Sequence, residues 1–296
     1  MDVGVHVVNF DFPGGGAAIG PTLARVGEAA ERAGVVNLSA MDHYLQIAGV
    51  GVGGAEAPML EGYTTLGYLA AHTQSVELQL LVTGVTYRHP GLLAKIVSTL
   101  DVLSGGRAAL GIGAAWYERE HAAYGVPCPP LKERFERLEE TLQIVRQVWG
   151  PDNGAYAGRH YQLAETICSP PPLHPVPVMV GGAGEKKTLR FVAKYADACN
   201  LFAGPHTSAG AVAAKLEVLA AHCEREHTDF ERIRKSVLWA APVEATERGG
   251  RELAGQLAAY ASAGVTDVHL MPWSGDPVGF VEGLGEHVVP RLAELG

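Results

Sequence analysis

The dipeptide Asp42-His43 places two side chains that can exchange protons directly after an apolar run, residues 35–40. That run predicts a short buried strand, and a carboxylate or an imidazole that is buried without a partner costs free energy. An ionised aspartate favours the protonated form of a neighbouring histidine, which titrates near neutral pH. The pair is therefore a candidate for general acid–base catalysis, and a hydrogen-bonded pair without a catalytic role is the alternative.

A glycine-rich turn, Gly-Gly-Ala-Gly at residues 181–184, is the second feature that could do chemistry. It leads from an apolar run into a segment with helical spacing, and the free N–H groups at the start of a helix attract anions. Glycines also let a phosphate approach the backbone closely. The turn is a candidate phosphate site, and an ordinary flexible turn is the alternative.

Strand-like and helix-like segments alternate along the chain and would position these residues. The predicted strands span residues 3–10, 35–40, 76–84, 107–113, 176–182, 197–204, 235–243 and 266–273. The predicted helices span residues 22–34, 62–73, 90–104, 132–149, 185–195, 209–226, 249–263 and 277–294. Parallel strands need such crossover helices, so this alternation over 296 residues predicts a (β/α)8 TIM barrel, with residues 1–296 as a single domain. No G-x-G-x-x-G motif opens the first helix, which argues against a dinucleotide-binding sheet.

The connection between the fourth and fifth predicted strands is irregular. Segments of about 113–131 and 150–175 contain many Gly, Pro and aromatic residues, and residues 156–163 predict a small hairpin. We interpret them as an insertion near the barrel mouth, and a mere cover of the barrel or a subunit contact is the alternative. Catalytic groups in such barrels lie at the C-terminal ends of the strands, so the Asp-His pair and the glycine turn are expected at one end.

Composition limits the classes of partner. The net charge is −9 and no basic block stands out, so nucleic acid is not expected to bind. No apolar run reaches about 18 residues and no signal peptide is recognisable, so neither a membrane span nor secretion is expected. The four cysteines are scattered, which fits reduced thiols in the cytoplasm. The first strand lacks an H-x-H pair, so no metal is expected, and His6 and His269 are interpreted as interior residues.

Four segments together resemble the bacterial luciferase-like monooxygenase superfamily, and within it the branch of deazaflavin-dependent (coenzyme F420) oxidoreductases. The segments are residues 41–43, 81–120, 134–149 and 178–202, in the order typical of the superfamily. The motifs that carry the resemblance are R-H-P at 88–90, L-S-G-G-R at 103–107, G-I-G at 111–113 and G-G-x-G-E at 181–185. The Asp-His pair is typical of the deazaflavin branch, whereas members that use flavin mononucleotide (FMN) more often carry Glu-His-His.

The resemblance implies a cofactor ring in the barrel mouth, with Asp42 and His43 beside it and His43 as a proton donor or acceptor. It implies that the segment behind the ring is Thr83, Gly84 and Val85, with a non-proline cis peptide at Gly84–Val85. It also implies that the ring pocket is lined by Ala114 and Ala115. The residues implied to bind the cofactor phosphate are Gly181, Gly182, Ala183 and Gly184. A homodimer acting on a small-molecule substrate is expected.

The expected activity is hydride transfer between coenzyme F420 and a small organic substrate. The alternatives are an FMN-dependent monooxygenase that uses molecular oxygen, a deazaflavin-binding protein without turnover, and a metal-dependent hydrolase. Ser39-Ala40 replaces a bulky stretch common in the family, and Trp116 stands where a sugar-phosphate-oxidising relative carries a catalytic glutamate, which argues against glucose 6-phosphate. The cations expected to attract the charged deazaflavin tail are Lys186, Lys187 and Arg190, so F420 is expected to bind more tightly than FMN.

Overall fold

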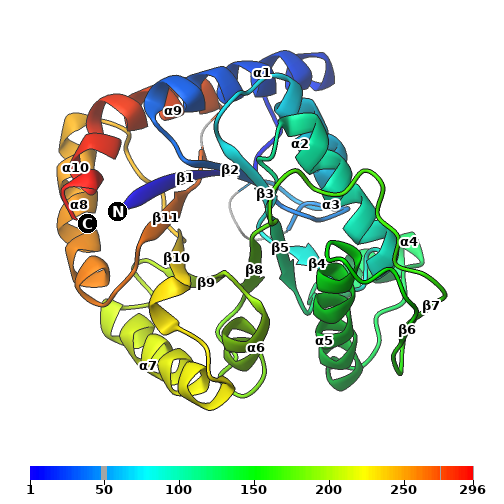
Figure 1. The fold of residues 1–296 in the computed structure, drawn as a ribbon. Helices are drawn as coiled ribbons and strands as arrows, with labels where there is room; N and C mark the ends of the chain where they lie inside the picture. Colours follow the sequence, from blue (N-terminus) through cyan, green and yellow to red (C-terminus); the bar gives the residue numbers. More distant parts are fainter. Residues whose placement is uncertain (48–51, 274, 296) are drawn as a thin grey trace.

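Parallel strands form a barrel that is surrounded by helices (Figure 1). The structure, a computed structural model, describes residues 1–47, 52–273 and 275–295. The barrel strands are β1 (Asp2–Val7), β2 (Asn37–Ala40), β3 (Glu77–Leu80), β4 (Thr83–Gly84), β5 (Leu110–Gly113), β8 (Val178–Gly181), β9 (Ala198–Ala203), β10 (Arg234–Trp239) and β11 (Asp267–Leu270). Their order is β3-β2-β1-β11-β10-β9-β8-β5-β4, and a parallel bridge from Leu78 to Ala108 joins the two ends. The predicted TIM barrel is confirmed.

The helices follow the predicted positions with three differences. They are α1 (Gly16–Ala33), α2 (Gly62–Ala71), α3 (Pro90–Ser104), α4 (Glu118–Tyr124), α5 (Leu131–Val148), α6 (Thr188–Tyr195), α7 (Ala209–Glu226), α8 (Glu247–Ser262), α9 (Pro277–His287) and α10 (Val289–Ala293). Helix α1 begins before Pro21, which lies inside it without a donor for the ladder. The predicted helix 277–294 is two helices separated at Val288, two residues before Pro290, which has no N–H to donate. Helix α4 was not predicted.

The third predicted strand is divided into β3 and β4 by a cis peptide bond between Leu81 and Val82. The predicted cis bond at Gly84–Val85 is therefore wrong. Gly84 lies opposite Gly113 in the parallel ladder, and the N–H of Val85 donates to the carbonyl of Gly113 at 3.0 Å. This segment continues the ladder with β5, which requires ordinary extended backbone.

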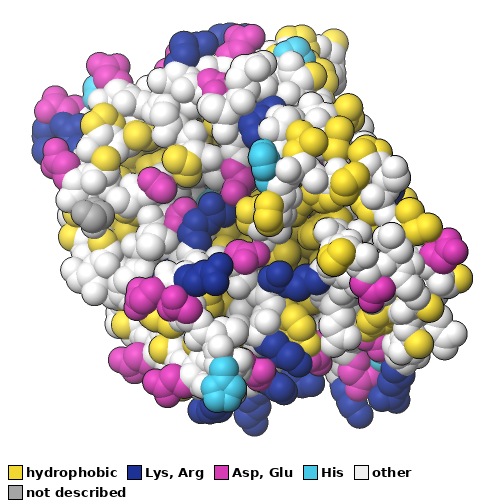
Figure 2. Space-filling view, in the orientation of Figure 1, with side chains coloured by type: hydrophobic (Ala, Val, Ile, Leu, Met, Phe, Trp, Pro, Cys, Tyr) yellow, Lys and Arg dark blue, Asp and Glu magenta, His cyan; other side chains and the backbone are white. Residues whose placement is uncertain are grey.

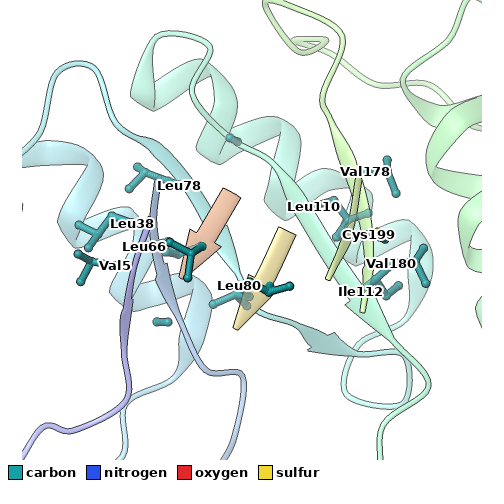
Figure 3. Packing of buried hydrophobic residues seen from close by; sticks show 14 of the residues in the cluster. Val5, Leu38, Leu66, Leu78, Leu80, Leu110, Ile112, Val178, Val180 and Cys199 are labelled. Atoms are coloured by element: carbon teal, nitrogen blue, oxygen red, sulfur yellow. The ribbon is translucent and has the colours of Figure 1, made fainter. Parts of the chain in front are cut away.

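Side chains on alternate positions of the strands face the helices or the barrel interior. Figure 3 shows Val5, Leu38, Leu78 and Leu80 near Leu66 of α2, and all of them are fully buried. A similar group on the other side of the view contains Leu110, Ile112, Val178, Val180 and Cys199. These contacts fix the strands against the helices and leave the opposite positions to fill the barrel.

The barrel interior contains buried histidines. His6 lies 3.0 Å from the hydroxyl of Ser39, and burial, as the largest cause, lowers the pKa of both His6 and His269 to about 3. Both imidazoles are therefore neutral at pH 7, in agreement with their interpretation as interior residues. In the described part of the chain, no group of three or more His, Cys, Asp or Glu side chains is arranged to hold a metal ion.

The insertion segments between β5 and β8 contain α4 before the barrel helix α5 and the predicted hairpin after it. The hairpin strands are β6 (Tyr156–Ala157) and β7 (Gln162–Leu163), which pair in antiparallel fashion. The carboxylate of Glu140 in α5 accepts N–H bonds from Arg159, His160 and Tyr161 at 2.8 to 3.2 Å and so attaches the hairpin to the helix. Figure 2 shows acidic and basic side chains interspersed over the face seen in the orientation of Figure 1. No described helix has the length and apolar character needed to cross a membrane.

Candidate active site

The C-terminal ends of the parallel strands bring most of the predicted site residues to one end of the barrel. Asp42 and His43 follow β2, Ala114 follows β5, and Gly181 ends β8. Because all the strands run in the same direction, these positions lie at the same barrel mouth.

His43 is held by a buried carboxylate from the insertion. Its Nδ1 atom lies 2.7 Å from Oε1 of Glu120 in α4, and the two side chains are 11% and 0% exposed. Glu120 also accepts the N–H groups of Tyr44 at 2.7 Å and Leu45 at 3.4 Å, and the hydroxyl of Tyr87 donates to it. Burial alone would raise the pKa of Glu120, but these donors hold it below its ordinary value. The ionised carboxylate thus orients the ring, and Nε2, which has no hydrogen bond to any residue of the described ranges, can exchange a proton.

Two aromatic rings enclose His43 on the side of the insertion. Trp116 and Tyr117 meet it edge to face, with centroids 5.8 and 5.9 Å away, and they stack on each other at 5.1 Å. Trp116 still exposes 59% of its surface. The histidine is therefore fixed from several sides, while an apolar surface beside it stays open.

Asp42 lies next to His43 in sequence but has other partners. Arg88 donates to its two carboxylate oxygens at 2.6 and 2.9 Å, and the hydroxyl of Thr83 donates to Oδ2. Arg88 also pairs with Glu61, the N-cap of α2. Asp42 is only 3% exposed. The expectation that Asp42 and His43 stabilise each other in one open cleft is wrong, because Asp42 is bound in a buried ion pair with Arg88.

Val82 occupies the top of the barrel interior. A Cβ atom on Gly111, Gly113 or Gly181 would lie 3.0 to 3.2 Å from its side chain, so these glycines make room for it. By contrast, the three residues expected behind the ring are buried and have other contacts. Thr83 donates to Asp42, Gly84 packs on Tyr87, and Val85 belongs to the hydrophobic core. Sequence reasoning missed Val82.

Ala114 and Ala115 lie half-exposed between β5 and the insertion. Ala115 adopts φ of 58°, and its carbonyl accepts a bond from Arg134 of α5 at 2.7 Å. Arg134 is 9% exposed, and its Nε finds no hydrogen-bond partner among the residues that the structure describes. A buried guanidinium with a spare donor and no carboxylate is suited to an anion. Sequence reasoning missed this residue.

The glycine turn leads into α6 as expected. Gly182 has φ of +116°, and a Cβ atom on Gly184 would lie 2.8 Å from Oγ1 of Thr188, so both positions need glycine. No side chain caps the start of α6. These features fit the phosphate of a cofactor.

Some of the cations near the turn form ion pairs with neighbouring carboxylates. Arg190 pairs with Glu226 at 2.7 Å, and Lys215 pairs with Glu185 at 2.6 Å. Glu185 is therefore neutralised by Lys215 and not by its neighbours Lys186 and Lys187. Within the described ranges neither Lys186 nor Lys187 forms an ion pair, so both are available to an anionic ligand.

A cavity of about 520 Å³ lies beside the mouth, next to the end of β4. Its lining includes Val85, Tyr87, Arg88, Arg137 and Tyr161. It adjoins the site through Tyr87, which donates to Glu120.

Comparison with known proteins gives the family. A family profile described as luciferase-like monooxygenase matches residues 1–271. The chain belongs to the luciferase-like monooxygenase family. Over 168 residues it is 32% identical to an F420-dependent glucose-6-phosphate dehydrogenase of Amycolatopsis mediterranei (strain U-32), a match that covers 56% of this chain and 47% of the relative. The chain thus spans about half the length of this curated relative.

Solved structures of luciferase-like proteins share the fold. An F420-dependent secondary alcohol dehydrogenase in complex with an F420-acetone adduct superposes with a TM-score of 0.81 over 98% of both chains, at 14% identity. A long-chain alkane monooxygenase superposes with a TM-score of 0.79 over 99% of this chain and 91% of its own, also at 14% identity. At such low identity these likenesses show the fold but not the reaction.

Proposed function

We propose that this luciferase-like protein is a coenzyme F420-dependent oxidoreductase that transfers a hydride between the deazaflavin and a small organic substrate. The observation that carries the proposal is the His43–Glu120 contact at the barrel mouth, 2.7 Å long. A histidine fixed through Nδ1 can present Nε2 to the oxygen of a substrate that gains or loses a hydride. The F420-dependent relative named above supports the choice of cofactor.

Each residue of the site has a separate role in this reaction. When bound, the deazaflavin supplies the hydride chemistry. His43 exchanges a proton with the substrate, and Glu120 keeps the ring in one tautomer and orientation. Asp42 stabilises the mouth through Arg88. Trp116 shields His43 from water on one side.

Cofactor binding is assigned to two groups of residues. The phosphate is bound by Gly181, Gly182, Ala183 and Gly184. Val82, Ala114 and Ala115 line the ring pocket, and Thr83 supports it from behind through Asp42.

An FMN-dependent monooxygenase is the second candidate, since the family profile and the alkane structure are both named as monooxygenases. Titration of the purified protein with F420 and with FMN in one buffer distinguishes the two. Tighter binding of F420, followed by substrate-dependent change in its absorbance under anaerobic conditions, supports the proposal. Tighter binding of FMN, or binding of neither cofactor, would refute it.

The homodimer and the cytoplasmic location stay predictions. The cysteines, Cys128, Cys168, Cys199 and Cys223, are all free thiols in the structure. Sedimentation of the purified protein measures its oligomeric state directly.

A further inference from the structure

Phe202 exposes 59% of its surface although it lies within the barrel strand β9. Its neighbours Leu201 and Ala203 are 3% and 1% exposed and belong to the hydrophobic core. Because side chains alternate along a strand, Phe202 faces the barrel interior, and its place near the end of β9 puts it at the mouth. An apolar ring exposed inside a concave site gains free energy when a ligand covers it.

Further apolar groups continue this surface. Leu238 lies opposite Phe202 in the ladder of β9 and β10 and is half-buried. Trp273, just after β11, is half-buried and packs on the cluster that contains Met41 and Met271. Beside His43, Trp116 offers another exposed aromatic ring.

Positive charge is missing from the same part of the mouth. Residues 203–208, 240–246 and 271–276, which follow β9, β10 and β11, contain no Lys or Arg, and their charged residues are Glu244 and Asp276. Arg88 is engaged by Asp42 and Glu61. An anionic group placed here would lose its hydration without gaining a cation, which is strongly unfavourable.

The order of the strands places this apolar surface between the two functional ends of the site. Going round the barrel from β8, which carries the glycine turn, to β2, which precedes His43, the sheet passes through β9, β10, β11 and β1. We infer that the substrate is an uncharged, apolar alcohol or the corresponding carbonyl compound, and not a phosphorylated sugar. This inference rests on the proposed function and adds the substrate class to it.

The reaction is balanced with the cofactor as the only other reactant. In the direction of oxidation, the C–H bond of the carbinol carbon breaks and its two electrons leave as hydride to the oxidised deazaflavin. The O–H bond breaks at the same centre, its proton passes to Nε2 of His43, and a C=O double bond forms. The alcohol is oxidised and the cofactor is reduced, and the reverse direction returns the proton from His43 to the carbonyl oxygen.

The test begins with the F420-loaded protein, with loading established by titration. Cyclohexanol and cyclohexanone serve as apolar probes, glucose 6-phosphate as the anionic probe, and glucose as its uncharged match. Calorimetric binding and turnover are measured for each. We expect cyclohexanol to be oxidised with kcat/KM at least about tenfold above that of glucose 6-phosphate, and cyclohexanone to bind more tightly than either sugar. Preferential binding and oxidation of glucose 6-phosphate would overturn the inference and leave the F420 assignment intact.

A pair of variants locates the apolar contact. Phe202→Ala should weaken cyclohexanone binding by about tenfold, because an aromatic ring that covers a ligand contributes at least about 1.5 kcal/mol. The matched control is Leu103→Ala, which removes an apolar side chain that is 75% exposed on α3, and it should leave binding unchanged. Equal affinity of Phe202→Ala and the parent protein would overturn the inference. Failure of the parent protein to bind F420 would instead overturn the proposed function itself.

Discussion

The carboxylate of Glu120 lies 2.7 Å from Nδ1 of His43, although 77 residues separate the two in the chain. Glu120 is fully buried and has donors from two loops around it, so it stays ionised and in place. A histidine bonded in this way has one tautomer when neutral, with the proton on Nδ1 and a lone pair on Nε2. The contact therefore converts an ordinary strand-end histidine into an oriented proton acceptor.

Replacement of the histidine tests its role in proton transfer. His43→Ala should lower kcat by about 100-fold or more, because a general acid–base group contributes about that much. The Kd for F420, measured by fluorescence titration, should change little, since the phosphate is bound elsewhere. A variant with full turnover would show that His43 is not the proton-transferring group.

Glu120→Gln tests the positioning role of the carboxylate. The amide keeps the size of the side chain but removes its charge, so the protonated form of His43 loses its stabilising partner. We expect a roughly tenfold or greater loss of kcat with an unchanged Kd for F420. Glu118→Gln, on the exposed face of the same helix, should leave both quantities unchanged. An unchanged kcat would show that Glu120 does not position His43 for proton transfer.

Asp42→Ala should reveal the buried ion pair with Arg88. The two side chains are 2% and 10% exposed, and removal of one partner from a buried pair costs about 3–5 kcal/mol of unfolding free energy. Denaturant unfolding measures the loss, and Asp11→Ala at the same end of the barrel should change stability by less than about 0.5 kcal/mol. The double variant Asp42→Ala, Arg88→Met should recover part of the loss, and no recovery would contradict the pairing.

The barrel could be predicted from the sequence because its strands are apolar runs separated by helical periodicity and glycine stops. The runs overshoot the observed strands by one to three residues in places such as 3–10 against Asp2–Val7, since extended residues at the mouth leave the ladder. The role of Arg107 in the L-S-G-G-R motif became clear only in the structure. Its guanidinium donates to the carbonyls of Ala70, Thr73 and Val76 at 2.9 to 3.1 Å and so fixes the end of α2.

The partners within the site could not be predicted. Glu120 lies in a polar stretch with no apolar periodicity, and only the packing of α4 makes it buried. The ion pair of Asp42 joins residues 46 positions apart, and local sequence carries no signal for it. Position at a strand end predicted which side chains reach the mouth, whereas hydrogen-bonding partners depend on the insertion.

Glu31 lies at the end of the barrel opposite the mouth, and its contribution to the free energy of unfolding should depend on pH. Glu31 accepts N–H bonds from Gln74, Ser75 and Val76 at 2.7, 2.8 and 3.2 Å. Partial burial would raise its pKa, but these donors and the hydroxyl of Ser75 lower it from 4.5 to about 2. A carboxyl whose pKa is lower in the folded state stabilises that state at pH values above its pKa in the unfolded chain. This stabilisation is lost as the pH falls through the pKa of the folded state. The difference in unfolding free energy between the parent protein and Glu31→Gln should therefore shrink between pH 4.5 and about 2, and a constant difference would contradict this.

The cations after the glycine turn should determine how salt affects cofactor binding. Lys186 and Lys187 form no ion pair in the described chain, whereas Arg190 is engaged by Glu226. The tail of F420 is anionic beyond the phosphate, so the double variant Lys186→Gln, Lys187→Gln should weaken F420 binding roughly three- to tenfold at low salt. Its affinity should also depend less on salt than that of the parent protein, because screening acts on the charges that have been removed. FMN lacks the acidic tail, so its binding should lose less affinity in the double variant.

Arg190→Gln is the matched control. It removes a charge from the same segment, but Glu226 already neutralises that charge, so F420 binding should stay near the parent value. An equal loss in the control and in the double variant would mean that the tail is bound by other residues.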